Sequence, residues 1–162
     1  MSSARALPLP EAAPLSQADY RALAELRYQI RGFLGFSERA ARAHGTEPQQ
    51  HQLLLALKGL PDGRRPTIGT LAERLCVEHH TVVTLTDRLE KAQLVQRSRG
   101  ASDRREVLLT ITKRGEDLLA QLSTIHRDQL KTVGPSLQRA LAAILERSEP
   151  QLGAPAAGSS AV

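Results

Sequence analysis

The sequence predicts a mainly α fold, with about six helices and a two- to three-stranded β-wing, from three observations. Hydrophobic residues make up 41% of the 162 residues but aromatic residues only 2%, and leucine and alanine dominate. This composition favours helices packed through aliphatic side chains over a β-sandwich. Apolar residues recur at three- and four-residue steps over much of the chain, and Val107, Leu109 and Ile111 alternate along one short segment at residues 106–111.

The length fits one domain with its own core. Residues 1–16 are rich in alanine and proline and are expected to form a loose arm, and residues 150–162 a disordered tail. The start lacks the apolar segment of a secretory signal, and no run of apolar residues is long enough to span a membrane. Cys76 is the single cysteine, so no intramolecular disulfide can form. We expect a soluble, cytoplasmic protein.

The first two helices are expected within residues 17–58. An apolar stripe predicts a first helix over residues 17–43, and Gly45 suits a left-handed cap at its end. Thr46 is expected to cap a second helix, with Pro48 in its first turn. The body of that helix is rich in leucine, and residues 59–66 are expected to form a loop.

Two short helices and two strands are expected next. Thr67 is expected to cap a third helix that runs through Leu75, and a fourth helix is predicted over residues 79–92. Residues 95–99 and 106–111 are predicted to form a β-hairpin, because residues 100–103 have a turn composition.

Two further helices are expected after the hairpin. Thr112 is expected to cap a long helix that continues to about residue 133. Gly134 and Pro135 are expected to break it, because proline removes a helical hydrogen bond. Pro135 would then open a last helix.

Residues 67–90 have the pattern of a helix-turn-helix. Ala72 supplies a small residue where the two helices cross. Five apolar residues lie at spacings that would lock the second helix on the first: Leu71, Leu75, Val77, Val82 and Leu85. Four polar residues remain for the outer face: His80, Thr81, Thr84 and Arg88. Such a helix fits the major groove of DNA, and a following basic hairpin predicts a winged helix-turn-helix.

The positive charge of the chain is concentrated beside this motif. Residues 88–114 hold eight lysines and arginines and three acidic residues, which accounts for the whole formal charge of +5. A basic excess confined to one segment is typical of a polyanion site, whereas a solvated basic face would spread its charges.

These residues resemble the MarR family of transcriptional regulators over roughly residues 23–145. The resemblance rests on four segments: Leu71-Ala-Glu-Arg-Leu75, Val83 with Asp87-Arg88-Leu89-Glu90, Asp103-Arg104-Arg105, and Ile111-Thr112 with Gly115. It implies an obligate homodimer that binds palindromic operator DNA, generally as a repressor. It also implies release of the DNA when a small lipophilic or phenolic molecule binds. The implied dimerisation region is residues 17–45 and 113–149, and the DNA-binding region is residues 46–112.

A dimer is also expected from the residues themselves. The first helix and the last two carry more apolar surface than a small winged domain could cover, and monomers rarely leave such patches exposed. A twofold dimer would bury this apolar surface and place two recognition helices about one DNA turn, or roughly 34 Å, apart.

Roles can be assigned to individual residues of the DNA-binding region. Arg104, at the wing tip, is the candidate for insertion into the minor groove, and Asp103 is expected to brace the wing. Arg97 and Arg99 are expected to contact phosphates. The full set of candidate DNA-binding residues is His79, His80, Thr81, Thr84, Arg88, Arg97, Arg99, Arg104 and Arg105.

Two residues depart from the family pattern. Cys76 stands at the corner of the helix-turn-helix, where family members often have glycine, and Glu78 stands where a serine or threonine usually caps the helix. A packing role for Cys76 is favoured over a redox switch, since nothing basic lies near enough to lower the pKa of the thiol. DNA contact or solvation is favoured over metal binding for His79 and His80, because adjacent histidines on a helix point apart.

Four residues are candidates for a ligand cleft: Tyr28, Phe33, Phe36 and His51. The alternative for each is an ordinary core position, and His126 is expected in the core or an interface. No cofactor, metal or enzymatic activity is expected, because no catalytic motif is present. The remaining alternative function is a winged-helix module that binds an acidic protein partner.

Overall fold

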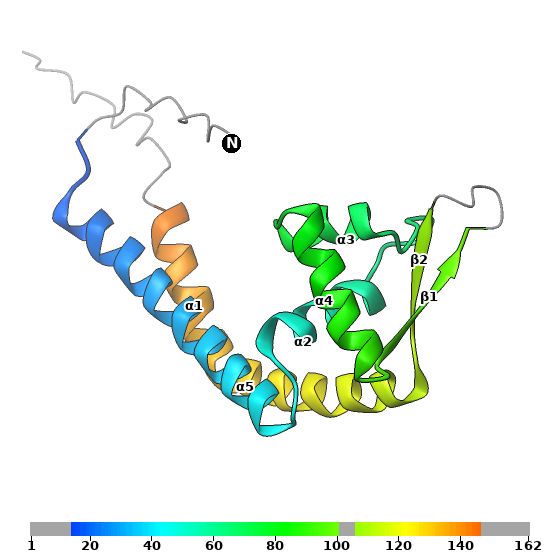
Figure 1. Cartoon of the computed structure of the whole chain (residues 1–162). Helices are drawn as coiled ribbons and strands as arrows, with labels where there is room; N and C mark the ends of the chain where they lie inside the picture. Colours follow the sequence, from blue (N-terminus) through cyan, green and yellow to red (C-terminus); the bar gives the residue numbers. More distant parts are fainter. Residues whose placement is uncertain (1–13, 101–105, 147–162) are drawn as a thin grey trace, which may run out of the picture. The chain divides into compact units, whose positions relative to one another are not determined.

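The computed structural model describes residues 14–100 and 106–146, and these residues confirm the mainly α class (Figure 1). In this part of the chain the elements are α1 (Gln17–Ala43), α2 (Pro48–Lys58), α3 (Ile68–Leu75), α4 (His79–Lys91), β1 (Val95–Arg99), β2 (Val107–Ile111) and α5 (Lys113–Leu145). Most of the predicted arm, the tail from residue 150 and the hairpin tip at residues 101–105 lie outside the described residues.

The chain divides into two compact units. One contains the beginning of α1, up to Arg31, together with the end of α5, from Val133. Within it these two segments line a shared groove of about 440 Å³, where Ala22 and Ala140 are buried. The other unit contains residues 32–132 and therefore α2, α3, α4 and both strands.

Several helix ends form as the sequence predicts. Gly45 has a φ of 76°, the left-handed conformation expected of a glycine cap, and Pro48 begins α2. The hydroxyl of Thr67 accepts a hydrogen bond from the backbone N–H of Thr70 at 3.1 Å, which caps α3. The hydroxyl of Thr112 accepts one from the N–H of Gly115 at 3.1 Å, which caps α5.

The prediction that Thr46 caps α2 was wrong. Glu47 holds the N-cap position with an extended backbone, and its N–H donates to the side-chain oxygen of Gln50 at 3.0 Å. Thr46 is buried, and its hydroxyl donates to the same Gln50 oxygen at 3.2 Å. The N-cap is therefore Glu47, one residue after the predicted Thr46. The N–H of Glu47 is satisfied by the side chain of Gln50 and not by Thr46.

The predicted break at Gly134 and Pro135 was also wrong, since α5 continues through Pro135 as a single helix. Proline removes one hydrogen bond, to the carbonyl of Lys131, and leaves the bonds on either side in place. Lys131 is exposed, so its carbonyl lies on a surface where water is available, while Val133 and Leu137 keep partly buried positions. Five helices, not six, result in the described part of the chain.

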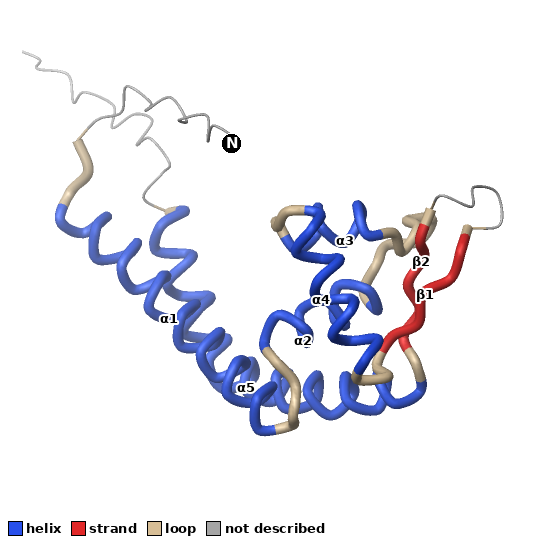
Figure 2. Tube along the Cα trace, in the orientation of Figure 1, coloured by secondary structure: helices blue, strands red, loops and turns tan. Residues whose placement is uncertain are grey.

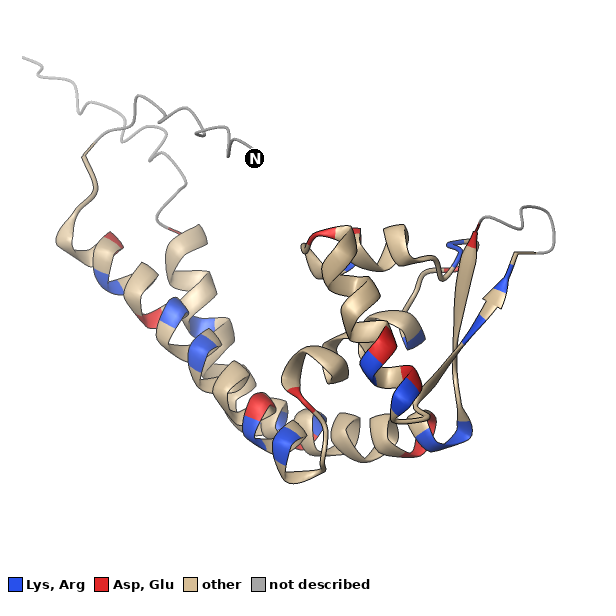
Figure 3. Cartoon of the chain, in the orientation of Figure 1, with Lys and Arg blue, Asp and Glu red and all other residues tan. Residues whose placement is uncertain are grey.

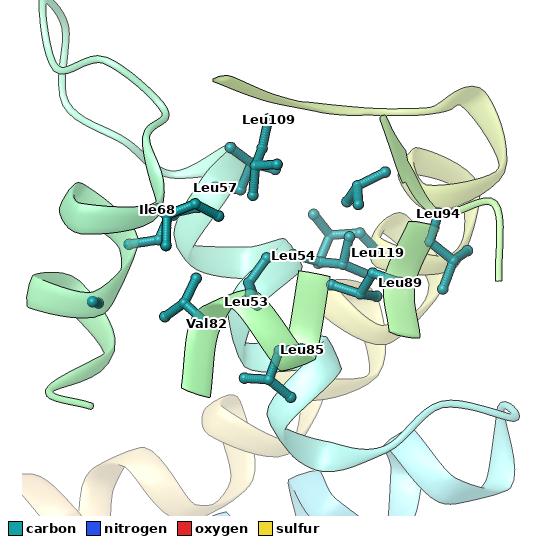
Figure 4. Packing of buried hydrophobic residues seen from close by; sticks show 13 residues of the cluster. Leu53, Leu54, Leu57, Ile68, Val82, Leu85, Leu89, Leu94, Leu109 and Leu119 are labelled. Atoms are coloured by element: carbon teal, nitrogen blue, oxygen red, sulfur yellow. The ribbon is translucent and has the colours of Figure 1, made fainter. Parts of the chain in front are cut away.

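The core of the larger unit lies between α2, α4 and the hairpin (Figure 4). Leu53 and Leu54 of α2 are fully buried and meet Val82 and Leu89 of α4, whereas Leu55 is 44% exposed. The core cluster comprises Leu53, Leu54, Leu57, Ile68, Leu71, Ala72, Val82, Leu85, Leu89, Leu94, Val95, Leu109 and Leu119. Because Val82, Leu85 and Leu89 of α4 pack into this core, the residues on the opposite side of the helix face solvent.

The hairpin is a two-stranded antiparallel sheet, shown as the red segments in Figure 2. Its register pairs Val95 with Ile111 and Arg99 with Val107, and β2 begins one residue later than predicted. Thr67, the residue just before α3, forms an isolated antiparallel bridge with Leu108 of β2. The sheet is therefore tied to the helix-turn-helix along β2.

The start of α5 packs tightly against the hairpin. A Cβ added to Gly115 would lie 2.2 Å from the backbone oxygen of Leu94, a distance that no side chain tolerates. The hydroxyl of Thr112 also donates to the carbonyl of Gln93 at 2.7 Å. These contacts fix the base of the hairpin to the helix that follows it.

Candidate nucleic-acid interface

The helix-turn-helix forms from the residues that the sequence indicates. α3 ends at Cys76, which adopts the left-handed conformation with a φ of 54°, and α4 begins after Glu78. Three of the predicted locking residues, Leu71, Val82 and Leu85, are buried, and Leu75 and Val77 pack partly buried against the same core. The predicted packing role of Cys76 was wrong, because its side chain is exposed.

The outward face of α4 is polar and exposed. His79, His80, Thr84 and Arg88 are exposed, and Thr81 is half-buried. The hydroxyl of Thr84 donates to the carbonyl of His80 at 3.1 Å, so it can offer only an acceptor to another molecule. Glu78 makes no side-chain capping hydrogen bond, which leaves the first N–H groups of α4 open. A helix held in this way can present several polar side chains to one partner.

One exposed residue of α4 was missed by the sequence interpretation. Val83 is 37% exposed although it was not assigned to the outer face. The pair Val82-Val83 carries the available signal, because neighbouring residues on a helix point about 100° apart and only one of the two can face the core.

The hairpin lies beside α4 and is braced close to its tip and along β2. Arg65 forms an ion pair with Glu106 at 2.5 Å, and the N–H of Gly100 donates to the carbonyl of Glu106 at 3.0 Å. The N–H of Leu109 donates to the carbonyl of Pro66 at 2.9 Å. Asp103, Arg104 and Arg105, predicted at the tip, lie outside the described residues.

Arg97 joins the hairpin to α4. Its guanidinium donates to Asp87 at 2.5 Å, to Glu90 at 2.8 Å and to the backbone carbonyl of Val83 at 3.3 Å. The Arg97 side chain is 28% exposed and thus partly shielded from solvent. The sequence offers no local signal for these contacts, because the partners lie seven to fourteen residues away on another element.

Other basic residues of the segment are exposed around this junction (Figure 3). Arg88, Lys91 and Arg114 have no ion pair with any residue that the structure describes, and Arg99 is also exposed. Lys113 is paired with Asp117, which raises the pKa of its ammonium group. Through Arg88, Lys91 and Arg114, the end of α4 and the start of α5 therefore carry unneutralised positive charge, which suits a polyanion.

Three of the four ligand-cleft candidates gather around His126. Its ring lies 6.2 Å from that of Phe33, 6.3 Å from that of Phe36 and 4.8 Å from that of His51, centroid to centroid. Tyr28 is not part of this cluster: it is 70% exposed and belongs to the smaller unit.

His51 and His126 are buried with incomplete hydrogen bonding. Both ring nitrogens of His51 and Nε2 of His126 have no hydrogen-bond partner among the described residues. Burial, together with the nearby His126, lowers the pKa of His51 to about 4. Burial also lowers the pKa of His126, against the opposing effect of a hydrogen bond to the Ser37 backbone. Both rings are thus held in the neutral form near pH 7.

Within residues 14–100 and 106–146, no group of three or more histidine, cysteine, aspartate or glutamate side chains could hold a metal ion. No helix in these ranges is long and apolar enough to cross a membrane.

Sequence comparison identifies relatives of the helix-turn-helix region. Residues 44–106 match the MarR family. The uncharacterized HTH-type transcriptional regulator YsmB of Bacillus subtilis is 30% identical over 82 residues, 51% of this chain and 56% of that protein. The HTH-type transcriptional regulator SarZ of Staphylococcus epidermidis is 32% identical over 73 residues, 45% of this chain and 49% of that protein. The chain thus matches about half the length of these curated relatives.

Solved structures resemble the chain over a longer range. AbsC, a MarR family transcriptional regulator from Streptomyces coelicolor, superposes with a TM-score of 0.65 at 20% identity, over 84% of this chain and 97% of that chain. The transcriptional repressor CouR, bound to a 23-mer DNA duplex, superposes with a TM-score of 0.59 at 26% identity, over 83% and 98% of the two chains.

The fold and the exposed helix beside a braced hairpin define a winged helix-turn-helix protein. Residues 44–106 match the MarR family, and the fold resembles that of a solved MarR family regulator.

Proposed function

We propose that this protein is a sequence-specific DNA-binding transcriptional regulator that acts as a homodimer on a palindromic operator. The observation that carries the proposal is the exposed polar face of α4 beside a basic hairpin, with Arg88, Lys91 and Arg114 free of ion pairs within the described residues. A helix of this kind enters the major groove, and a flanking hairpin contacts the adjacent backbone or minor groove.

The proposal assigns each part of the surface a role. His79, His80, Thr81, Thr84 and Arg88 would meet base edges or nearby phosphates from α4. Arg99 and Arg105 would contact phosphates, and Arg104 would enter the minor groove, with Asp103 bracing the wing. Arg97 needs a different role, because two carboxylates already bind its guanidinium. We therefore propose that it positions the hairpin against α4.

The homodimer has support in the smaller unit. Large apolar side chains of α1 and α5 are exposed there, which a soluble protein rarely tolerates without a partner. They are Tyr20, Leu23, Tyr28, Ile30, Leu141 and Leu145, and Leu15 lies just before α1. A twofold axis would bury them in pairs and give a palindromic DNA site.

Repression and ligand control complete the proposal. A bound repressor would be released from DNA by a small lipophilic or phenolic molecule. Phe33, Phe36 and His51 are the candidate ligand residues that the fold brings together, and the unsatisfied His51 nitrogens offer a ligand hydroxyl or carboxyl group a partner.

Selection of bound sequences from random duplex DNA tests the proposed function. We expect the protein to enrich an inverted repeat whose half-sites lie about 10 base pairs apart, centre to centre. Arg104→Ala should weaken binding to the selected duplex, while the thermal unfolding midpoint stays at the wild-type value. Failure to enrich any sequence, together with binding to an acidic protein, would instead favour a protein-interaction module.

A further inference from the structure

Val83 is an apolar side chain on a polar surface, and neither core packing nor an ion pair explains its placement. The adjacent Val82 is fully buried and supplies the core contact, whereas Val83 is 37% exposed. Residues next to it on the helix surface, such as His79, His80 and Asp87, are polar and exposed. Val83 therefore presents its two methyl groups to whatever α4 binds.

The position of Val83 is fixed by the surrounding contacts. Its backbone carbonyl accepts a hydrogen bond from Arg97 at 3.3 Å, and Arg97 is itself held by Asp87 and Glu90. Valine in a helix has one strongly preferred rotamer, so its methyl groups lose little freedom on binding. The side chain also lines a groove of about 480 Å³ between α4 and the hairpin, in which Val107 lies on the opposite wall.

The neighbouring residue offers similar chemistry. The hydroxyl hydrogen of Thr84 is committed to the His80 carbonyl, so the free groups of that side chain are an acceptor oxygen and a methyl group. Val83 and Thr84 together place methyl groups on the exposed surface of α4, with Val83 on the side nearer the hairpin. In the major groove of DNA the only methyl group of an ordinary base pair is the 5-methyl of thymine.

We propose that Val83 is a specificity-determining residue that contacts the 5-methyl group of a thymine in each half-site. The inference rests on the DNA-binding function proposed above. Cytosine carries hydrogen at the same position, and a purine presents no methyl group there, so the contact would favour thymine over each other base.

Single replacement of thymine by deoxyuridine tests the contact, because it removes only the methyl group. The probe is a fluorescein-labelled duplex of the sequence that the wild-type protein selects from random DNA, with each thymine replaced in turn. Fluorescence anisotropy should show one position per half-site at which the replacement weakens wild-type binding by about fourfold. Val83→Ala should bind the unmodified duplex more weakly by a similar factor and show no further loss at that position.

The controls separate this contact from a general effect on folding or binding. Leu55→Ala removes a similarly exposed apolar side chain from α2 and should keep the full sensitivity to deoxyuridine. Wild-type binding unchanged by every replacement would overturn the inference, as would equal sensitivity in Val83→Ala, and both results would leave the DNA-binding function standing. Absence of binding to any duplex would overturn the proposed function and this inference with it.

Discussion

At the scale of single residues, the buried pair of His51 and His126 links stability to pH. The fold places the two imidazoles against Phe33 and Phe36, and the structure shows no acidic partner for either among the described residues. Protonation of either ring would put a charge into an apolar site. The folded state therefore binds a proton less readily than the unfolded chain.

The pH dependence follows from the lowered pKa of His51. The folded value is about 4 and the ordinary value is 6.5, so the stabilising contribution is complete above pH 6.5 and is lost as the pH falls toward 4. Between pH 7.5 and pH 5 we expect His51 to reduce the free energy of unfolding by about 2 kcal/mol. Urea unfolding at the two pH values measures this loss.

Two variants isolate the contribution of His51. His51→Leu should lose much less stability on acidification than the wild type, because its side chain cannot bind a proton. His44→Gln, which replaces an exposed histidine, should retain the wild-type dependence. An unchanged pH dependence in His51→Leu would show that the buried pair does not bind protons as described.

Cys76 illustrates a local conformational cost. Its φ of 54° is unfavourable for a residue with a Cβ, and its exposed side chain makes little compensating contact. Cys76→Gly should raise the free energy of unfolding by roughly 0.5–1 kcal/mol, since glycine adopts this conformation without strain. Cys76→Ala should not stabilise the protein, and thermal unfolding of the two variants distinguishes backbone strain from an effect of the thiol.

At the scale of elements, Arg97 determines how the hairpin is held against α4. Its ion pairs are only partly shielded, so we expect Arg97→Ala to lower the free energy of unfolding by about 1 kcal/mol. The same change should weaken DNA binding clearly, because the wing would lose its fixed position beside the recognition helix. Arg97→Lys should restore binding only in part, since one ammonium group cannot span both carboxylates.

The salt dependence of binding separates positioning from phosphate contact. Arg97→Ala should lower affinity without changing the slope of log K against log salt, because no phosphate contact is lost. A slope reduced by about 1 would show instead that Arg97 binds a phosphate.

The elements show which features the sequence could predict. Helix ends set by one side chain within three residues were predicted correctly, as at Thr67 and Thr112. The cap at Glu47 was missed because Thr46 carries the expected capping hydroxyl, although the Gln50 side chain, also three residues away, accepts from the Glu47 N–H. The continuity of α5 was missed because its flanking residues outweigh one lost hydrogen bond at Pro135. In both places the sequence contains two competing local signals.

The candidate site was predictable where helical spacing decides exposure. His80, Thr84 and Arg88 lie on the outward face of α4 as three- and four-residue steps require. Contacts between elements could not be predicted from the sequence. The ion pair of Arg97 with Asp87 and the ring contact of His51 with His126 depend on tertiary packing. No spacing rule connects those residues.

At the scale of the whole molecule, the exposed apolar residues of the smaller unit predict a dimer of 17.6 kDa chains. Leu141→Glu should shift the protein toward monomer or lower its folding yield, because it places a charge in the proposed interface. Leu55→Glu, at a similarly exposed position in the larger unit, should remain dimeric. Sedimentation equilibrium measures the mass of each, and a monomeric wild type would contradict the proposed assembly.

The most direct test of DNA binding is the affinity of the wild-type protein for its selected duplex as a function of salt. A dimer that neutralises about 6–10 phosphates should lose roughly 10³–10⁵ in affinity between 50 and 200 mM salt, with a linear log–log dependence. This is the result we expect from the basic surface around α4 and β1. Affinity that does not change with salt, or no binding at 50 mM salt, would contradict the account.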